Sequence, residues 1–338
     1  MRLLLTGSTG FVGRNLLLDV LRRGEYEQII LPVRNLEKLR AQLLGDGFEQ
    51  IPTCIRAVEQ AMDAWDFESF GKIDHVVHSA GVLFADNESE YRRVNVEGTL
   101  RLISKLGNAD KIVILSSMAA SGPCANNQSV RSESDLPDPI NAYGRSKLEM
   151  ENELRKQFSH LPYVCLRPPM VLGPRDQATL PLFKMARFWL APKPGLNPKV
   201  YSYISVADLV GSIQAVLSSP LDLRRTSQKE YFVACPRKIS DRELIQTAAQ
   251  SLNRSILLIP IPETLIEMVS RLCSKIPYLK DVIPDSLHPH RVSEILPDRW
   301  VCSGDAFETQ FHHHCLESLS KSLDEACLWY QKTGQLKA

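Results

Sequence analysis

The chain has 338 residues, of which 44% are hydrophobic and 23% are charged, so it can bury the core of one large domain or two smaller ones. Its 40 basic and 39 acidic residues give a formal charge of +1, so the chain has no strong overall field to attract nucleic acid or an anionic membrane. This excludes polyanion binding through net charge as its main role. No apolar run is long enough to span a bilayer, and no separate leader-like region precedes the first predicted strand. Eight dispersed cysteines, none in a CxxC pair, favour a reduced cytoplasmic protein.

The chain begins with a strand, a helix and a second strand. Its apolar periodicity predicts a strand at Arg2–Thr6, a helix at Gly13–Arg23 and a strand at Gln28–Val33. Further short apolar strands are expected at 75–81, 111–117 and 163–169, separated by segments with helical periodicity. Strands that alternate with helices predict an α/β fold, a Rossmann-type doubly wound parallel sheet that binds ligands at the carboxyl ends of its strands.

The composition changes after Pro168. Residues 171–199 are rich in proline and large apolar side chains, which predicts part of a cap. Residues 200–220 return to a strand followed by a helix, whereas 221–338 predict several amphipathic helices. We therefore expect a sheet domain built from 1–170 and 200–220, and a smaller discontinuous C-terminal cap, built from 171–199 and 221–338, that binds the substrate.

Three glycines, Gly7, Gly10 and Gly13, lie between the first strand and the first helix. This spacing allows a tight turn, close approach of a pyrophosphate and close packing of the helix on the strand, while the helix offers its N-terminal amides to the anion. A tight turn that binds nothing is the alternative. The flanking strand and helix are nevertheless the context that the phosphate-binding motif requires.

The second strand ends in LPVRN, which places Arg34 where dinucleotide-binding folds usually carry an acid for the adenosine ribose. An acid would repel a 2′-phosphate, whereas an arginine can bind one through two charge-assisted hydrogen bonds. The sequence therefore predicts NADP(H) as the preferred cofactor and NAD(H) as the alternative. An ordinary surface arginine is the competing interpretation of Arg34.

Tyr143 and Lys147 are four residues apart at the start of a predicted helix, so their side chains share one face. An ammonium beside a phenol stabilises the phenolate, which makes Tyr143 a candidate proton donor and acceptor. The strand KIVILSS ends upstream in Ser116 and Ser117, and a serine there can hydrogen-bond a substrate carbonyl or alkoxide. The alternatives are a chance YxxxK spacing and a serine that only caps the strand end.

The run His312, His313, His314 and Cys315 contains residue types that bind metals. Consecutive residues on a helix point in different directions, whereas zinc ligands must converge. We therefore expect no metal site and interpret this run as a solvated helix surface.

The segments TGSTGFVG, HSAG, LSSMAASG, YGRSK, LRPPMVLGP and YISVADL follow one another in this order. Together they resemble the landmarks of the extended short-chain dehydrogenase/reductase family, which includes epimerases and dehydratases, and the match covers residues 1–215. The resemblance implies that Tyr143 is the acid/base, that Lys147 binds the nicotinamide ribose beside it, and that Ser117 polarises the substrate oxygen. Further cofactor contacts are implied at Thr9, Gly10, Phe11, Val12, Ser79, Ala80, Gly81 and Pro168.

Asn95, in RRVNVEGT, matches an asparagine of that family with a structural and cofactor-side role. A polar residue inside a helix that the backbone satisfies is an equally good interpretation. The family often dimerises through helices on one sheet face, so a homodimer is compatible with the resemblance.

Departures from the family pattern bear on the reaction. Met118 and Ala119 follow Ser117, where sugar-nucleotide dehydratases carry an Asp-Glu pair. Epimerases on sugar nucleotides tend to carry diphosphate-binding asparagine and arginine residues, where this chain has Pro169 with Met170 and Tyr201 with Ser202. The predicted cap instead offers the apolar side chains Leu180, Leu182, Phe183, Met185, Phe188, Trp189 and Leu190, which form either a substrate pocket or the core of the cap.

The leading hypothesis is therefore an NAD(P)-dependent oxidoreductase that interconverts an alcohol and a carbonyl on a fairly apolar small molecule by hydride transfer. Two alternatives stay open. One is a nucleotide-sugar epimerase with tightly bound NAD, and the other is a non-catalytic NADP-binding regulatory protein, because one fold hosts several functions.

Overall fold

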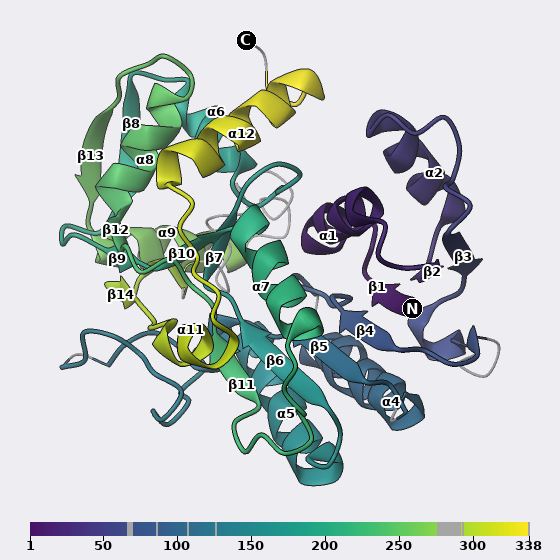
Figure 1. The fold of residues 1–338 in the computed structure, drawn as a ribbon. Coiled ribbons are helices and arrows are strands. Elements are labelled where there is room, and N and C mark those ends of the chain that lie inside the picture. The colour runs from purple at the N-terminus through teal and green to yellow at the C-terminus, as the bar shows by residue number, and fades with distance from the viewer. Residues whose placement is uncertain are drawn as a thin grey trace.

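The computed structural model describes residues 1–65, 70–85, 87–106, 108–125, 127–275, 292 and 294–336. Figure 1 shows a twisted parallel sheet flanked by helices, with a second group of helices and short strands beyond the carboxyl ends of the sheet strands. Among the described residues, no helix combines the length and the hydropathy needed to cross a membrane.

The sheet has seven parallel strands in the order β11-β6-β5-β4-β1-β2-β3. They are β1 (Arg2–Thr6), β2 (Gln28–Val33), β3 (Ile55–Glu59), β4 (His75–His78), β5 (Lys111–Leu115), β6 (Tyr163–Arg167) and β11 (Glu230–Phe232). The five strands expected within 1–170 are all present in this sheet, and the Rossmann-type fold is confirmed, whereas the strand expected in 200–220 lies outside the sheet. The strand order reverses between β1 and β4, and such a switch point opens the crevice where ligands bind in this class of sheet.

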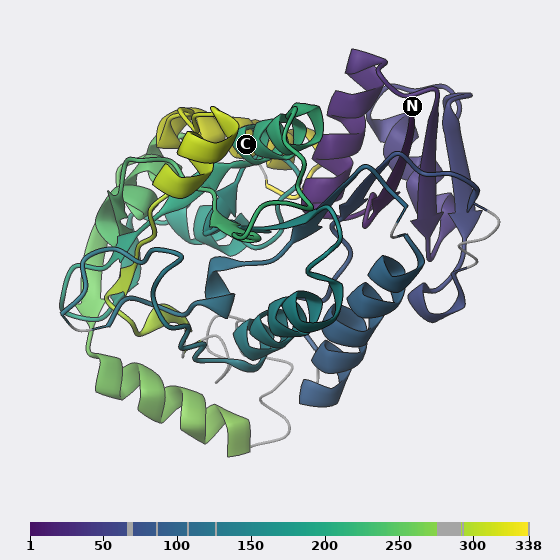
Figure 2. The same cartoon turned by 60° about the horizontal axis from the view of Figure 1, so that its bottom comes forward.

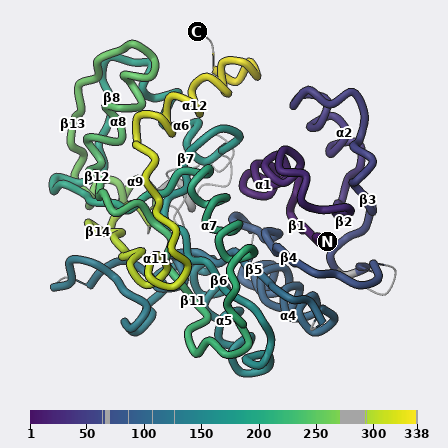
Figure 3. The backbone as a smooth tube through the Cα atoms, viewed as in Figure 1, coloured from purple at the N-terminus to yellow at the C-terminus, as the bar shows by residue number. Residues whose placement is uncertain are grey.

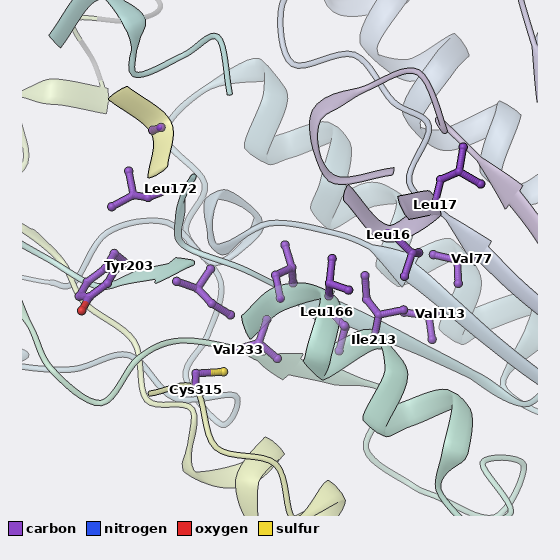
Figure 4. Packing of buried hydrophobic residues seen from close by; sticks show 14 of the residues in the cluster. Leu16, Leu17, Val77, Val113, Leu166, Leu172, Tyr203, Ile213, Val233 and Cys315 are labelled. Carbon is purple, nitrogen blue, oxygen red and sulfur yellow. The ribbon is translucent and has the colours of Figure 1, made fainter. Parts of the chain in front are cut away.

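Two buried clusters hold the sheet between helices. Leu3 and Leu5 of β1 belong to one cluster, and Leu4 belongs to the other, because alternate residues of a strand point to opposite faces. Helices α1 (Phe11–Arg23) and α7 (Val206–Ser218) cover the first face. Helices α4 (Gly98–Lys105) and α5 (Ala142–Phe158) cover the second. Figure 2 shows the two layers on either side of the sheet, and Figure 4 shows side chains of the first cluster.

Short helical elements connect the strands of the sheet. They are α2 (Leu36–Gly45), η1 (Met62–Ala64), α3 (Glu88–Tyr91), the π-helix η3 (Arg92–Glu97) and η4 (Met118–Ala120). π-helical turns are rare and occur frequently at functional sites.

Beyond the main sheet, a second group of described residues forms three small sheets and five helices, and it includes 200–205 as well as parts of the predicted cap. Its strands are β7 (Met170–Leu172), β8 (Leu190–Pro194), β9 (Val200–Tyr201), β10 (Tyr203–Ser205), β12 (Ile239–Ser240), β13 (Leu257–Ile261) and β14 (Arg299–Trp300). Its helices are α6 (Leu180–Ala186), α8 (Asp241–Gln250), α9 (Glu263–Lys275), α11 (Asp305–Phe311) and α12 (Leu319–Lys332). The chain trace in Figure 3 shows that α6 and α12 lie side by side there, and the rings of Phe183 and Tyr330 meet edge to face at 5.3 Å.

Two details of the sequence-based picture differ from the structure. Glu230–Phe232, in a region assigned to the cap, forms the edge strand β11 of the main sheet because it pairs with β6. The histidine run is no helix surface, since α11 ends at Phe311 and His312 has a positive φ of 51°. Among the described residues, no group of His, Cys, Asp and Glu side chains is arranged to hold a metal ion.

The apolar side chains that the sequence places in the cap between Leu180 and Leu190 differ in their burial. Leu180 and Phe183 are buried in the first core cluster, so they stabilise the cap rather than line a pocket. Phe188 and Trp189 are exposed to solvent.

Candidate active site

The turn after β1 has the shape that a phosphate-binding loop needs. Gly7 has a φ of 72°, and the Gly10 amide donates to the Gly7 carbonyl at 2.9 Å, which closes the turn. A Cβ at Gly13 would lie 2.3 Å from the Gly7 oxygen, so only glycine lets α1 pack this closely on the turn. Gly10, at the tip, is exposed.

Helix α1 begins with its amides free of side-chain caps. Gly10 is the N-cap residue and supplies no side-chain hydrogen bond, and the first turn carries no acid. By contrast, Asn35 caps α2, Asn141 caps α5 and Ser205 caps α7 through side-chain oxygens. The free amides and the positive dipole end of α1 therefore fit a pyrophosphate. Thr9, Phe11 and Val12, expected to contact the cofactor, lie on this turn and are partly accessible.

A buried histidine supports the turn from below. Nδ1 of His78 contacts the Thr6 hydroxyl at 2.8 Å, and Nε2 contacts the Thr99 hydroxyl at 2.9 Å. The Thr99 hydroxyl donates to the Asn95 carbonyl, so Nε2 of His78 must be the donor and Nδ1 the acceptor. Burial, with the nearby Lys147 charge in the same direction, lowers the pKa of His78 to about 3. This imidazole is therefore neutral and joins β1, β4 and α4.

The loop after β4 packs against the glycine turn. The Ser79 hydroxyl donates to the Thr6 carbonyl at 2.7 Å, and the Ala80 amide donates to the Thr6 hydroxyl at 3.3 Å. A Cβ at Gly7 would lie 2.7 Å from the Ala80 nitrogen. Gly81 follows as an exposed position, with Lys147 Nζ 3.6 Å from where its Cβ would be.

Asn95 is used entirely within the protein. Its side-chain oxygen accepts from the Val82 amide at 2.9 Å, and its Nδ2 donates to the Val82 carbonyl at 3.1 Å and to the Ser146 hydroxyl at 3.0 Å. Both hydrogens of the side-chain amide are therefore donated within the protein, and Asn95 holds the loop after β4 against α5. Its geometry matches the structural half of the sequence-based interpretation.

Ser117 lies directly after β5 and caps η4, where its hydroxyl accepts from the Ala119 amide at 3.1 Å. The Met118 amide donates to the Pro168 carbonyl at 2.9 Å. That bond ties the end of β5 to the end of β6, so the two expected site residues Ser117 and Pro168 lie on neighbouring strand ends.

Tyr143 and Ser117 come together because of one glycine. Gly144 faces η4, and a Cβ there would lie 2.3 Å from the Ala119 oxygen, so α5 approaches η4 closely. Burial raises the pKa of Tyr143 to about 12, while a hydrogen bond with Ser117 acts in the opposite direction. Tyr143 is therefore a neutral phenol at pH 7 in the protein alone.

Lys147 lies one turn after Tyr143 and is buried. Its Nζ donates to the Leu115 carbonyl at 2.8 Å, at the last residue of β5. Burial lowers the pKa of Lys147 to about 8, and the Glu151 carboxylate acts in the opposite direction. Burial of the phenol has the largest effect on the pKa of Tyr143 in the protein alone, and the effect of Lys147 on that phenol stays a prediction.

A buried ion pair supports both strand ends. Glu151, four residues after Lys147, pairs with Arg167 of β6 at 2.6 Å and also accepts from the Ser116 hydroxyl. Sequence reasoning missed this pair, as it missed His78. The signal was an acid one helical turn after Lys147, on a helix face that otherwise points into the core.

Arg34 follows β2 and is exposed. It has no hydrogen-bond or ion-pair partner among the residues that the structure describes, so its guanidinium is free to bind an anion. Nearby, Gln42 of α2 donates to the Thr9 carbonyl at 3.1 Å, which joins α2 to the glycine turn.

The residues present fit a nicotinamide dinucleotide. The uncapped start of α1 matches a pyrophosphate, and the exposed Gly81 leaves room beside Lys147 that a larger residue would fill. The loop after β4 contacts the glycine turn through Ser79 and Ala80 and approaches Lys147 at Gly81, so it joins the two parts of the site.

Comparisons with known proteins agree with this geometry. The chain is 26% identical over 286 residues to a UDP-glucose 4-epimerase of Vibrio cholerae, covering 81% of this chain and 82% of that protein. It is 28% identical over 186 residues to a decarboxylating sterol-4-alpha-carboxylate 3-dehydrogenase of Candida albicans, covering 53% of this chain and 53% of that protein.

Among solved structures, the fold matches UDP-glucuronic acid 4-epimerase from Bacillus cereus in complex with UDP-glucuronic acid and NAD. The TM-score is 0.76 at 17% identity, over 98% of this chain and all (100%) of that one. The family model described as NAD dependent epimerase/dehydratase family matches residues 3–218. The chain therefore belongs to the NAD dependent epimerase/dehydratase family, within the extended short-chain dehydrogenases/reductases.

Proposed function

We propose that this chain is a nicotinamide-dependent 4-epimerase acting on a sugar joined to a diphosphate. One observation carries the redox part of the proposal. Ser117, Tyr143 and Lys147 meet at the end of β5, and the loop holding Gly81 joins them to the glycine turn. A secondary alcohol placed between the Ser117 and Tyr143 hydroxyls can lose its proton there.

A dinucleotide bound along the glycine turn and beside Lys147 would supply a reversible hydride acceptor. The chain's own part is to hold and move the proton. The Tyr143 phenol donates its proton to the ketone oxygen as the ketone is reduced, and the phenolate so formed takes the proton of the alcohol in the reverse step, while Ser117 donates a hydrogen bond to the same oxygen as charge develops on it. Lys147 supplies positive charge next to this site while its ammonium is protonated, which holds below pH 8. Epimerisation requires that the ketone turn over and be reduced on its other face.

The choice of epimerisation is supported by the comparisons. The Vibrio relative that covers most of this chain is a UDP-glucose 4-epimerase, and the matching Bacillus structure is a UDP-glucuronic acid 4-epimerase bound to NAD. We propose that the cap, 171–199 and 221–338 without the sheet strand β11, contributes the sugar and diphosphate contacts, and that 1–170 with 200–220 holds the dinucleotide. A purely regulatory role would leave the Tyr143 proton donor without a use.

The nucleotide preference is a separate part of the proposal. Arg34 is exposed and unpaired among the described residues, which favours a 2′-phosphate and therefore NADP(H). The neighbouring solved structure contains NAD, so NAD(H) is the competing outcome.

A second candidate is a dehydrogenase that acts on an apolar secondary alcohol. By the family resemblance, Met170 of β7 and Tyr201 of β9 take the places of an amide and a guanidinium that bind a diphosphate, and neither supplies a charge. The Candida relative, a sterol-4-alpha-carboxylate 3-dehydrogenase, agrees with this reading.

One experiment separates the two candidates. Purified protein is incubated with UDP-galactose or UDP-glucose, and in parallel with a panel of sterols and other apolar secondary alcohols, each with NAD⁺ or NADP⁺. Interconversion of the two sugars, followed by chromatography, without net absorbance change at the nicotinamide band supports the epimerase. Net absorbance growth with an apolar alcohol supports the dehydrogenase, and no reaction in any tube contradicts both.

A further inference from the structure

The two-stranded sheet formed by β8 and β13 presents an apolar face to solvent. The strands are parallel, and their register pairs Leu257 with Leu190, Ile259 with Pro192 and Ile261 with Pro194. Paired residues of a parallel ladder point to the same side, and alternate residues of each strand share a face. We call this face the apolar ribbon; it consists of Leu190, Pro192, Pro194, Leu257, Ile259 and Ile261.

On the opposite face of the same sheet, the residues of β8 are already covered. Ala191 and Lys193 are buried, and the Lys193 ammonium pairs with Asp241 of α8 at 2.9 Å and donates to the Asn197 carbonyl at 2.7 Å. The apolar ribbon is therefore the outward side. Figures 1 and 2 show β8 and β13 at the margin of the cap, on the far side of the molecule from β2 and β3.

Large exposed side chains extend the apolar ribbon at one end. Trp189 is 72% exposed and Phe188 is 67% exposed, and both directly precede β8. The Leu257 amide donates to the Trp189 carbonyl at 2.8 Å, which fixes this end of the ribbon. Leu257 itself is 61% exposed. Soluble monomers rarely expose so many large apolar side chains together, so the surface is suited to a partner.

Addition of another strand is a poor way to cover it. Pro192 and Pro194 of β8 and Pro260 of β13 lack backbone N–H groups, so neither strand offers a full edge for pairing. A partner must contact the face rather than the edges.

Basic side chains lie at the same end. Lys184 and Arg187 are exposed just before Phe188, and the Arg254 guanidinium donates to the Arg187 carbonyl at 3.1 Å. Within the described part of the chain, no carboxylate pairs with Lys184, Arg187 or Arg254. The small net charge of the whole chain therefore conceals a local positive cluster beside an apolar surface.

We propose that the apolar ribbon, with Phe188 and Trp189, docks the protein on the surface of a membrane that contains anionic lipids. Tryptophan and phenylalanine occupy the interface between head groups and acyl chains, and the neighbouring cations match lipid phosphates. Together these two features select a lipid surface over an apolar protein partner, which would leave the cations unpaired. The inference rests on the surface alone and not on the proposed reaction.

The test is flotation of the full-length protein with vesicles of phosphatidylcholine containing one-third phosphatidylglycerol, and with vesicles of phosphatidylcholine only. The variants are Phe188→Ser with Trp189→Ser, and Arg187→Gln with Arg254→Gln. Leu136→Ser is the matched control because Leu136 is 88% exposed and lies outside the ribbon. All substituted residues are exposed, and thermal melting confirms that each variant is folded.

We expect the wild type and Leu136→Ser to float with the anionic vesicles, with binding that weakens as salt is raised. Each double variant should bind about tenfold less or weaker still, because it loses buried apolar area or cation contacts. Absence of binding, or equal binding by the Phe188 and Trp189 double variant, overturns the proposal. A wild-type dimer that this variant converts to a monomer in gel filtration also overturns it, since a second copy then covers the ribbon.

Discussion

The Glu151 carboxylate accepts two hydrogen bonds from the Arg167 guanidinium, one from Nε at 3.0 Å and one from Nη2 at 2.6 Å. Both side chains are buried, at 1% and 6% exposure, and Glu151 also accepts from Ser116. The pair thereby joins α5, which carries Tyr143 and Lys147, to the ends of β5 and β6. A buried pair of this kind is costly to break, because removing one partner leaves the other charge uncompensated.

This relationship gives the first prediction. The Glu151 carboxylate favours the ammonium form of Lys147, whose pKa burial lowers to about 8. Activity should therefore fall as pH rises through 8, and Glu151→Gln should move this alkaline limb to lower pH and reduce turnover about tenfold. The measurement is the pH profile of kcat. Glu149→Gln is the control, because Glu149 is a half-buried acid of the same helix that pairs with Arg92, and identical profiles for both variants would contradict a positioning role.

Replacing Tyr143 by Phe should remove the proton donor while leaving the fold intact. We expect turnover of the substrate identified in the panel to fall about 100-fold or more. Cofactor affinity, measured by calorimetric titration, should change about twofold at most because the phenol is not expected to bind the dinucleotide strongly. A variant with wild-type turnover would refute the assignment of Tyr143.

Arg34→Asp should reverse nucleotide preference. Losing a charge-assisted pair to a 2′-phosphate should weaken NADPH binding about tenfold or more, and the new acid should favour the ribose hydroxyls of NADH. Titration of both nucleotides against wild type and variant measures this. Arg40→Gln, on the exposed side of α2, serves as the control. If the wild type already binds NADH more tightly, the NADP(H) preference is wrong.

Gly144→Ala should separate the tyrosine helix from the serine strand end. The added Cβ would lie 2.3 Å from the Ala119 oxygen, so α5 and η4 must move apart, at a cost of about 1–3 kcal/mol in the free energy of unfolding. We also expect kcat to fall, since Ser117 and Tyr143 lose their mutual position. Gly45→Ala is the matched control, because nothing lies within 4 Å of a Cβ there. Urea unfolding and kcat should stay near wild type in that variant.

Acid should destabilise the protein in part through His78. Its pKa is about 3 in the folded state against 6.5 for an unperturbed histidine, so only the unfolded chain takes up the proton between these values. This contribution to stability is present above pH 6.5 and is lost as pH falls, by about 1.4 kcal/mol per pH unit. His78→Gln should have a smaller loss than wild type in urea unfolding between pH 7 and pH 5. Equal losses would show that His78 is protonated in the folded state.

Local features of the site could be predicted from the sequence. The turn at Gly7, Gly10 and Gly13 depends on residues that adjoin one another, and the spacing of Tyr143 and Lys147 depends only on the helical repeat. Short-range geometry of this kind is encoded in neighbouring residues, so the phosphate turn and the YxxxK pair were both visible before any fold was known.

What tertiary structure alone decided were the contacts between distant segments. Which strand would join β6 depended on a residue stretch at Glu230–Phe232 that is too short to carry a clear periodic signal. The packing of helices on the sheet decided that His78 contacts Thr6 and that Glu151 pairs with Arg167. It also decided that Phe183 is buried in the core whereas Trp189 is exposed to solvent. Sequence specifies the character of each residue, but burial and pairing are properties of the packed chain, because they arise only when remote segments meet.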